Sequence, residues 1–467
     1  MRHLSAFALR GFRPDWSVAR GLVVLALPII ASMVSRTVMS FVDFIMVSQL
    51  GTEAQAAIMP AAVVLFTFIC FGLGTLSVVG ALVSQSLGRG ELHECSAWAW
   101  QGVYLALIGG VLVLPAWFIA EPFFAFVGHE PRVQAMEVVY VQIGLLGVGP
   151  AMAGMALASF FNGIHRPWVG FWAAVISNIF NVIANYALIF GNLGFEAMGM
   201  AGAAWATSAA ALLQMLILIA WMLRARCHAM FRSRDTWRFS WRRCRRILRF
   251  GTPAGAQFVV ELLAWTVFTL WLIGRFGTEQ LAAHNIAFRF LELSFMPAIG
   301  LGTALTAAVG RSIGQGDYAL ARSQVRWALV MAMGYMGLIA LSYIFFGTQM
   351  AAMLSDDEEV IYWAARILLL CAVFQVFDAM GITYIHALRG AGDNFVPAVI
   401  MIALAIVVCI GGGFALAIYV PEWGSLGPWV AATAYVILVG ICALARFRHG
   451  AWQRIELLEP KQSPDAV

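Results

Sequence analysis

The sequence predicts an all-α, multi-pass membrane protein with twelve transmembrane helices in two six-helix bundles related by pseudo-twofold symmetry. Three observations support this fold class. The chain of 467 residues is 62% hydrophobic and only 11% charged, which is more apolar side chain than one soluble core can bury. Apolar runs long enough to span a bilayer recur along the chain. The two halves of the chain also repeat one another.

The repeat relates residues 28–90 to a second segment about 226 positions later. Gly51 and Gly88 correspond to Gly277 and Gly314, and the spacing within each pair is 37 residues. Six spans in each half give the two repeats the same orientation. This arrangement predicts a pseudo-twofold axis along the membrane normal.

Each predicted span is a mainly apolar run of about 20 residues or more, the length that a helix needs to cross the hydrocarbon layer. The first six runs lie near 22–47, 57–83, 97–119, 138–161, 168–190 and 199–223. The second six lie near 252–274, 282–309, 326–350, 361–387, 396–420 and 426–446. We therefore expect bundles at 1–223 and 250–446, an Arg-rich cytoplasmic connector at 224–249 and a cytoplasmic tail at 447–467.

Basic residues predict that both termini are cytoplasmic. Ten arginines lie between Arg224 and Arg249, and Arg389 also falls on the side of the termini, whereas external loops carry acidic residues such as the run 356–359. Because Lys and Arg in short loops stay in the cytoplasm, the bias predicts a protein of the cytoplasmic (inner) membrane. The connector suits the anionic inner leaflet, so the expected macromolecular partner is the lipid bilayer and not nucleic acid.

Two carboxylates at membrane depth are the leading functional candidates, because a charge there is unfavourable without a partner or an aqueous cavity. Counting helix rise, Glu261 lies about 14 Å into the seventh span and Asp378 about 25 Å into the tenth. Both fall near the middle of the bilayer in the second half. Two carboxylates that share a site repel when both are ionised, so the pair would bind H⁺ or Na⁺. The alternative is that each only hydrogen-bonds a neighbouring helix.

The first half contributes Arg36 and Asp43, seven residues apart on one face of the first span. An ion pair between them is one alternative, and a cavity-facing Asp43 is the favoured one. The repeat aligns Asp43 with Phe268, so the halves share a scaffold but not their charges. Carboxylates needed for the scaffold would tend to occur twice. This asymmetry favours a functional role for Asp43, Glu261 and Asp378.

Further polar residues are candidates for a substrate cavity. Asn178, Asn181 and Asn185 form one stripe on the fifth span, which either joins helices by hydrogen bonds or lines a cavity. Arg289 and Glu292 are three residues apart on a helix and are expected to pair.

Aromatic residues stand one helical turn from each carboxylate of the second half, Trp265 beside Glu261 and Phe374 beside Asp378. A ring next to a carboxylate can hold an organic cation by cation–π and Coulomb attraction together. Both rings are therefore candidate substrate contacts.

Signatures of enzyme chemistry are absent from the sequence. No Gly-x-x-x-x-Gly-Lys occurs, the only lysine being Lys461, and neither a Ser/His/Asp nor a metalloprotease arrangement is present. The seven cysteines lack metal-ligand spacing. We expect no enzyme activity, no cofactor, no zinc and no disulfide. A membrane-embedded transferase or hydrolase would need a reactive cluster, and a receptor would not explain the buried acids.

The motifs of both halves resemble those of the multidrug and toxic-compound extrusion (MATE) family over nearly the whole chain. The first span is similar to the family's opening motif through Leu25-Ala26-Leu27-Pro28, Val42-Asp43 and Gly51-Thr52. The second half is similar to its counterpart through Phe250-Gly251-Thr252-Pro253, Glu261, Phe374-Gln375-x-x-Asp378 and Leu388-Arg389-Gly390. The resemblance implies the MATE fold, with a V-shaped cavity that alternates between the two faces. It further implies an antiporter exporting small organic cations and other amphiphilic drugs in exchange for Na⁺ or H⁺. Separately, we expect the protein to be a monomer.

The resemblance leaves the coupling ion open. Glu261 and Asp378 match the acidic positions of the cation site in the NorM-like branch, so Na⁺ could bind there, although Phe374 stands where some members carry a tyrosine. Asp43 and the asparagine stripe match the polar cluster that the DinF-like branch links to protons.

The alternative function within the same superfamily is that of a lipid-linked oligosaccharide flippase. Such flippases present many cationic residues to a pyrophosphate, and only Arg36 and Arg289 are candidates here.

Overall fold

A computed structural model describes residues 16–459, in which twelve helices are long and apolar enough to cross a membrane. No β-strand occurs between these residues. The predicted fold class is confirmed, and each of the twelve predicted spans corresponds to a helix. The basic residues at positions 2, 10, 13 and 461, which contribute to the predicted orientation, lie outside the described range.

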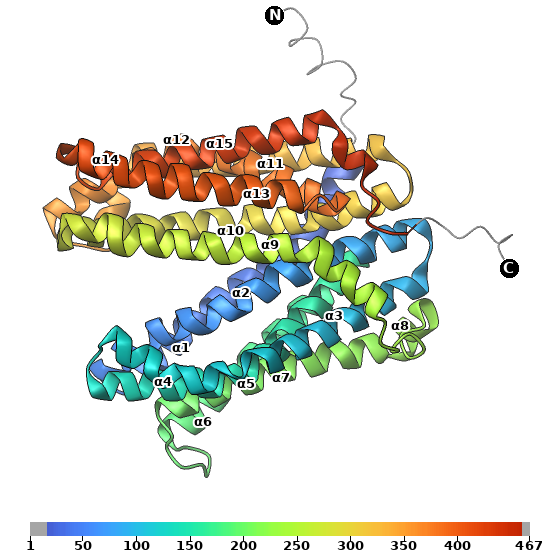
Figure 1. Ribbon diagram of the computed structural model, residues 1–467, viewed down its shortest axis with the longest axis horizontal. Coiled ribbons are helices and arrows are strands. Elements are labelled where there is room, and N and C mark those ends of the chain that lie inside the picture. Colours follow the sequence, from blue (N-terminus) through green and yellow to red (C-terminus); the bar gives the residue numbers. More distant parts are fainter. Residues whose placement is uncertain (1–15, 460–467) are drawn as a thin grey trace, which may run out of the picture.

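The first group of helices runs from blue to green in Figure 1. Its members are α1 Trp16–Ser48, α2 Thr52–Arg89, α3 Leu92–Val113, α4 Ala116–Val127, α5 Pro131–Gly163, α6 Pro167–Phe190 and α7 Met200–Leu223. The short helix α4 corrects the prediction of a third span reaching residue 119. Pro115 stands between α3 and α4, and since proline has no backbone N–H to donate, the chain breaks there into two helices.

The second group follows the short helix α8 Ala225–Phe231. Its members are α9 Trp241–Val267, α10 Thr278–Gly314, α11 Tyr318–Ala352, α12 Glu358–Ala391, α13 Phe395–Leu404, α14 Gly413–Tyr419 and α15 Leu426–His449. A π-helical segment, Phe268–Ile273, continues α9, and another, Ala405–Gly412, joins α13 to α14 into one span. The seventh span begins at Trp241 instead of near 252, so the last part of the expected connector is helical.

Helix α1 packs with both groups. Its first half belongs to the hydrophobic core of the second group through Ala19, Leu22, Ala26 and Ile29. Its second half belongs to the first group, where Val47 is buried and Asn178 of α6 donates to the Ser35 hydroxyl at 2.9 Å. Pro28 lies inside the helix close to this changeover, where a missing backbone hydrogen bond allows a change of direction.

The two groups meet closely at the end of the molecule where α1 begins and where the segment after α15 lies (Figure 1). A Cβ atom at Gly88 of α2 would lie 2.2 Å from the Arg311 carbonyl oxygen, and one at Gly314 of α10 would lie 2.2 Å from the Gln85 carbonyl oxygen. The repeat aligns these two glycines, so the contacts are reciprocal. Gln85 also donates to the Gly390 carbonyl at 2.9 Å. We call this contact the terminal seam, and only glycine permits so close a backbone approach.

The segment after α15 crosses the terminal seam. Trp452 stacks on Phe447 of the second group with ring centroids 5.0 Å apart. Leu457 and Leu458, which are 1% and 3% exposed, instead belong to the hydrophobic core of the first group. The described part of the predicted tail is therefore packed against both groups.

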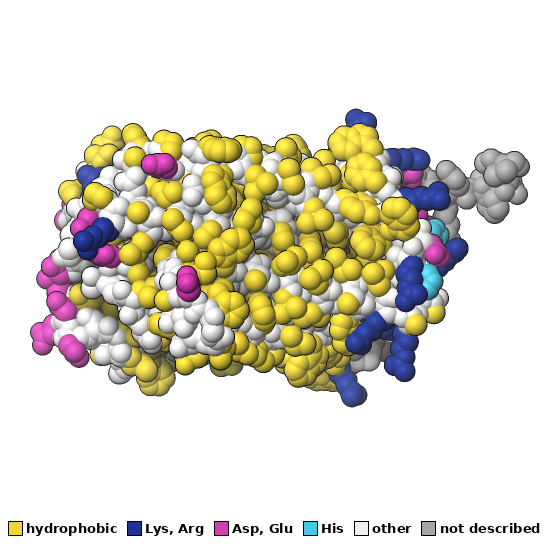
Figure 2. All heavy atoms as spheres, turned by 90° about the horizontal axis from the view of Figure 1, so that it is seen from below, with side chains coloured by type: hydrophobic (Ala, Val, Ile, Leu, Met, Phe, Trp, Pro, Cys, Tyr) yellow, Lys and Arg dark blue, Asp and Glu magenta, His cyan; other side chains and the backbone are white. Residues whose placement is uncertain are grey.

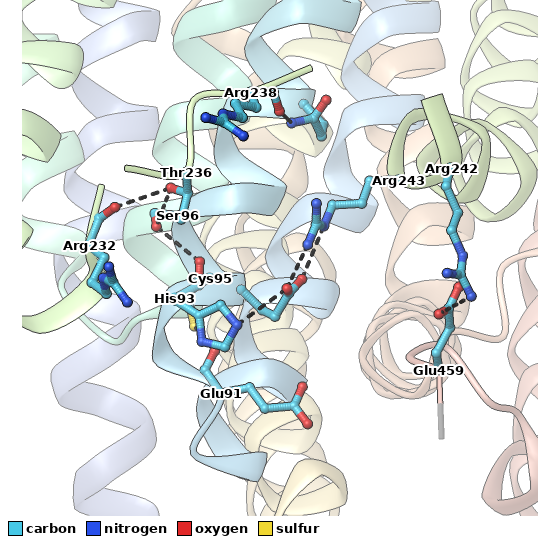
Figure 3. A network of polar contacts seen from close by, with 12 residues as sticks. Glu91, His93, Cys95, Ser96, Arg232, Thr236, Arg238, Arg242, Arg243 and Glu459 are labelled. Carbon is cyan, nitrogen blue, oxygen red and sulfur yellow. Dashed lines mark hydrogen bonds and ion pairs between the residues drawn. The ribbon is translucent and has the colours of Figure 1, made fainter. Parts of the chain in front are cut away.

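Polar contacts fix the end of this segment. Arg89 of α2 donates to the Glu459 carbonyl at 2.6 Å, and Arg246 of α9 donates to the Leu457 carbonyl at 2.6 Å. The Glu459 carboxylate lies 2.5 Å from Arg242 (Figure 3) and 3.1 Å from Arg246. Connector arginines thus bind the chain's own carboxyl-terminal segment.

One face of the molecule shows how charge is distributed (Figure 2). Hydrophobic side chains cover most of this face, Lys and Arg gather at its right-hand end, and acidic side chains gather at its left-hand end. This asymmetry is the one on which the predicted orientation rests.

Candidate functional site

The two predicted carboxylates of the second half come together between α9 and α12. Glu261 and Asp378 are both half-buried and interact electrostatically with one another. Glu261 accepts hydrogen bonds from the Tyr435 hydroxyl of α15 at 3.3 Å and from Gln257 Nε2 at 3.5 Å. We call these residues, with Arg389, the carboxylate site.

Arg389, Gln257 and Tyr435 are the members of the site that the sequence did not identify, and Arg389 is the charged one. Its Nη2 donates to Gln257 Oε1 at 3.2 Å, its guanidinium lies 5.2 Å from the centroid of the Phe258 ring, and it interacts electrostatically with Glu261. The position near the end of an apolar run suggested a residue at the membrane face. Helix geometry could have found it, because Arg389 lies about three turns from Asp378 on the same face of α12.

Donor chemistry at Glu261 suits an ionised carboxylate. A phenol hydroxyl and an amide NH₂ donate to its two oxygens, and an arginine lies beyond the amide. An ionised carboxylate only accepts hydrogen bonds, so these donors leave both oxygens with lone pairs for a cation. The arrangement can therefore bind a cation between α9 and α12.

A second polar cluster joins α1, α6 and α7. Asn185 Nδ2 donates to Asp43 Oδ1 at 2.5 Å and to Asn181 Oδ1 at 2.9 Å, and Asn181 Nδ2 donates to the Thr207 hydroxyl at 3.4 Å. Tyr140 of α5 interacts electrostatically with Asp43. We call this group the Asp43 cluster. Its two buried asparagines hold helices together, and the buried Asn185 Oδ1 is one acceptor without a partner.

Asn178 and Arg36 lie apart from this cluster. Asn178 donates to the backbone carbonyl of Ser35 at 3.2 Å as well as to its hydroxyl. Arg36 is exposed, and within the described range it forms no ion pair with Asp43. Of the two alternatives for Arg36 and Asp43, the internal ion pair is therefore not formed. The asparagine stripe is split, because Asn178 contacts Ser35 whereas the other two asparagines belong to the Asp43 cluster.

Arg289 and Glu292 form the expected pair on α10, with Nη1 and Oε2 3.4 Å apart. Their side chains are 67% and 37% exposed. An ion pair so exposed contributes little to stability, so this contact is a weak local one.

The two aromatic candidates differ in exposure. Trp265 is half-buried and packs against Phe268 and Trp429, with ring centroids 5.4 and 6.3 Å apart. Phe374 is 2% exposed and belongs to the hydrophobic core of the second group. This corrects the expectation that Phe374 contacts substrate, because its position on α12 turns the ring toward neighbouring helices.

Comparisons with known proteins agree with the repeat. The sequence profile of the MatE family matches residues 28–187 and 253–414, one segment in each half. A protein of Rhizobium meliloti named probable multidrug resistance protein NorM is 30% identical over 417 residues, which are 88% of this chain and 89% of the relative. Multidrug resistance protein PmpM of Pseudomonas aeruginosa is 28% identical over 452 residues, 95% of this chain and 94% of that protein.

Solved structures show the same fold. One described as the outward-facing conformation of a multidrug resistance MATE family transporter of the MOP superfamily aligns with a TM-score of 0.84 at 21% identity. The alignment covers 93% of this chain and 96% of that one. With the profile matching both halves, the chain belongs to the MatE family, whose members are transporters and not enzymes.

Proposed function

We propose that this protein is a secondary antiporter that exports cationic, amphiphilic drugs or toxic organic compounds in exchange for Na⁺ or H⁺. The observation that carries the proposal is the carboxylate site, where Glu261 and Asp378 interact inside the second group of helices. Carboxylates at membrane depth mark ion and substrate paths. The relatives named as multidrug resistance proteins support drug efflux as the activity.

Exchange requires only that the two cations compete. A coupling ion at Glu261 and Asp378 removes the negative charge that would hold an organic cation, so each ligand lowers the affinity for the other. The two groups of helices would then alternate between a state closed at the terminal seam and a state open there. We place both termini in the cytoplasm and the protein in the inner membrane, working as a monomer.

The Asp43 cluster is a candidate second proton site. Its carboxylate is hydrogen-bonded by Asn185 and is half-buried between α1 and α6. Protonation of Asp43 would remove the charge that this hydrogen bond stabilises and so loosen α1 from α6. Because α1 also packs in the core of the second group, such a change would reach both groups.

The flippase alternative is less well supported. A pyrophosphate headgroup needs several free cationic side chains, and of the two candidates Arg289 is already paired with Glu292. The antiporter is therefore the favoured function.

The proposal is tested with purified protein in liposomes, where efflux of a cationic dye is driven by a Na⁺ gradient or a pH gradient, each imposed alone. Glu261→Gln and Asp378→Asn should each abolish ion-driven efflux while the protein stays folded, because each removes a carboxylate charge. Glu53→Gln serves as the control, since this carboxylate lies in an exposed ion pair with Arg132, away from the carboxylate site. Wild-type efflux in both site variants would refute the mechanism.

A further inference from the structure

We propose that Arg389 is a built-in countercharge that limits the carboxylate site to one monovalent cation at a time. This inference rests on the proposed function, because it takes the site to bind both the coupling ion and the substrate. Its consequence is an exchange of one ion for one monovalent drug cation, with no net charge moved across the membrane.

The position of Arg389 between α9 and α12 supports this role. It shares α12 with Asp378, while its contacts are to α9, through the 3.2 Å hydrogen bond to Gln257 and the ring of Phe258. Gln257 in turn donates to Glu261, so the amide links the guanidinium to the carboxylate. The arginine is held by two contacts to the helix that carries Glu261. Its charge is therefore fixed about one turn of α9 from Glu261 and about three turns of α12 from Asp378.

The charges around the site can be counted. Glu261 and Asp378 are the acidic groups, and Arg389 is the cation that interacts with Glu261. Tyr435, Cys70 and Cys409 are also near Glu261. The ordinary pKa values of tyrosine and cysteine lie above 7, so these side chains are uncharged at neutral pH.

His386 is the remaining titratable neighbour. Its Nδ1 lies 2.8 Å from the Ile382 carbonyl, and the positive charge of Arg389 acts on it. Because burial among the helices and, to a lesser extent, the charge of Arg389 both disfavour a second positive charge there, His386 adds none to the count. With both carboxylates ionised, the site therefore carries one net negative charge.

One net charge decides how many cations the site accepts. A single H⁺, Na⁺ or monovalent drug cation brings it to neutrality, and a second would leave an unpaired positive charge at membrane depth, which is unfavourable. Without Arg389 the same site would carry two negative charges. It would then take two monovalent cations or one divalent organic cation. If Arg389 had a purely structural role, replacing it would change stability or expression but not the number of cations that the site binds.

The experiment measures the ions exchanged per drug molecule. The probe is tetraphenylphosphonium, a monovalent organic cation, in proteoliposomes with the membrane potential clamped by K⁺ and valinomycin. The rate of wild-type exchange should not depend on the imposed potential, and about one coupling ion should move per drug cation. Arg389→Gln should make exchange depend on the potential and raise the ratio toward two. Arg389→Lys keeps the charge and should behave as wild type.

A binding measurement covers the case in which Arg389→Gln does not transport. Calorimetry of tetraphenylphosphonium binding to the purified protein, in buffers of different ionisation enthalpy, counts the protons released, and a ²²Na⁺ displacement count does the same for sodium. About one ion per drug is expected for wild type. Two ions per drug in the wild-type protein would overturn the inference without any variant.

The outcomes separate the two proposals. Ion-driven transport with the same ratio in wild type and Arg389→Gln overturns the countercharge but leaves the antiporter standing. Wild-type protein that shows no ion-driven efflux overturns both. A ratio that changes in Arg389→Gln and is restored in Arg389→Lys supports the role of the charge.

Discussion

Replacing Gly314 by alanine should open the terminal seam. The added Cβ would lie 2.2 Å from the Gln85 carbonyl oxygen, whereas ordinary contacts begin at 3.4 Å. The backbones of α2 and α10 must therefore separate by about 1.2 Å at this point. Neither backbone can rotate away as a flexible side chain would, so the strain falls on the contact between the two groups of helices.

The size of the effect follows from the cost of overpacking a close contact, about 1–3 kcal/mol. Because the strain exists only while the seam is closed, it should shift the equilibrium toward the open state by about 5- to 150-fold. Gly88→Ala should act in the same direction, since its Cβ would lie 2.2 Å from the Arg311 carbonyl oxygen. The two substitutions share one contact, so their effects should not add fully.

Hydrogen exchange measured by mass spectrometry on the purified protein reports this equilibrium. Peptides covering 80–91 of α2 and 306–317 of α10 should exchange faster in Gly314→Ala, because amide exchange follows the population of open states. Gly334→Ala is the matched control. It adds the same methyl group to a transmembrane helix at a glycine whose Cβ would have nothing within 4 Å.

Unchanged exchange in both seam peptides of Gly314→Ala would refute this reasoning. It would mean that the helices absorb the methyl group locally and that the repeated glycines do not set the distance between the groups. Faster exchange over the whole protein would also count against it, because that result indicates general destabilisation.

Further predictions concern the carboxyl-terminal segment and the Asp43 cluster. Leu457→Ala should destabilise the docked segment by about 2–5 kcal/mol, because this leucine is 1% exposed. Leu354→Ala, at a position that is 57% exposed, should have no such effect. Limited proteolysis of the carboxyl-terminal segment measures the difference, and equal cleavage in both variants would contradict the prediction. Asn185→Ala should remove a hydrogen bond to a charged group and weaken the α1–α6 contact by about 1.5–3 kcal/mol. Thermal unfolding in detergent checks this, with Asp43→Asn, which keeps an acceptor oxygen, as the milder comparison.

The helices themselves could be predicted because their signals are local. Apolar length marks each span, and the number and approximate positions of the twelve spans needed no knowledge of packing. The start of α9 was missed because residues 241–249 are rich in arginine. A helical signal was nevertheless present, since Cys244, Ile247 and Gly251 recur at helical spacing and are buried.

The carboxylate site could be predicted only in part. Glu261 and Asp378 stood out because charges are rare in apolar runs, and the structure places them within electrostatic reach. Arg389 did not stand out, because a basic residue at the end of a span is ordinary. Its contacts with Gln257 and Phe258 depend on where the bundle places α9 relative to α12, which no local pattern encodes.

The sequence alone established a duplicated, twelve-helix membrane protein with a few charges at membrane depth, because hydrophobic length, repeat spacing and charge within an apolar run can each be recognised without knowing how the helices pack. How those segments act together became clear only from the packing of the helices. It showed that the repeated Gly88 and Gly314 form the closed contact between the groups, that α1 packs in both, and that Gln257 links Arg389 to Glu261. These features arise from side chains and backbones of helices far apart in the chain, whose approach is set by packing.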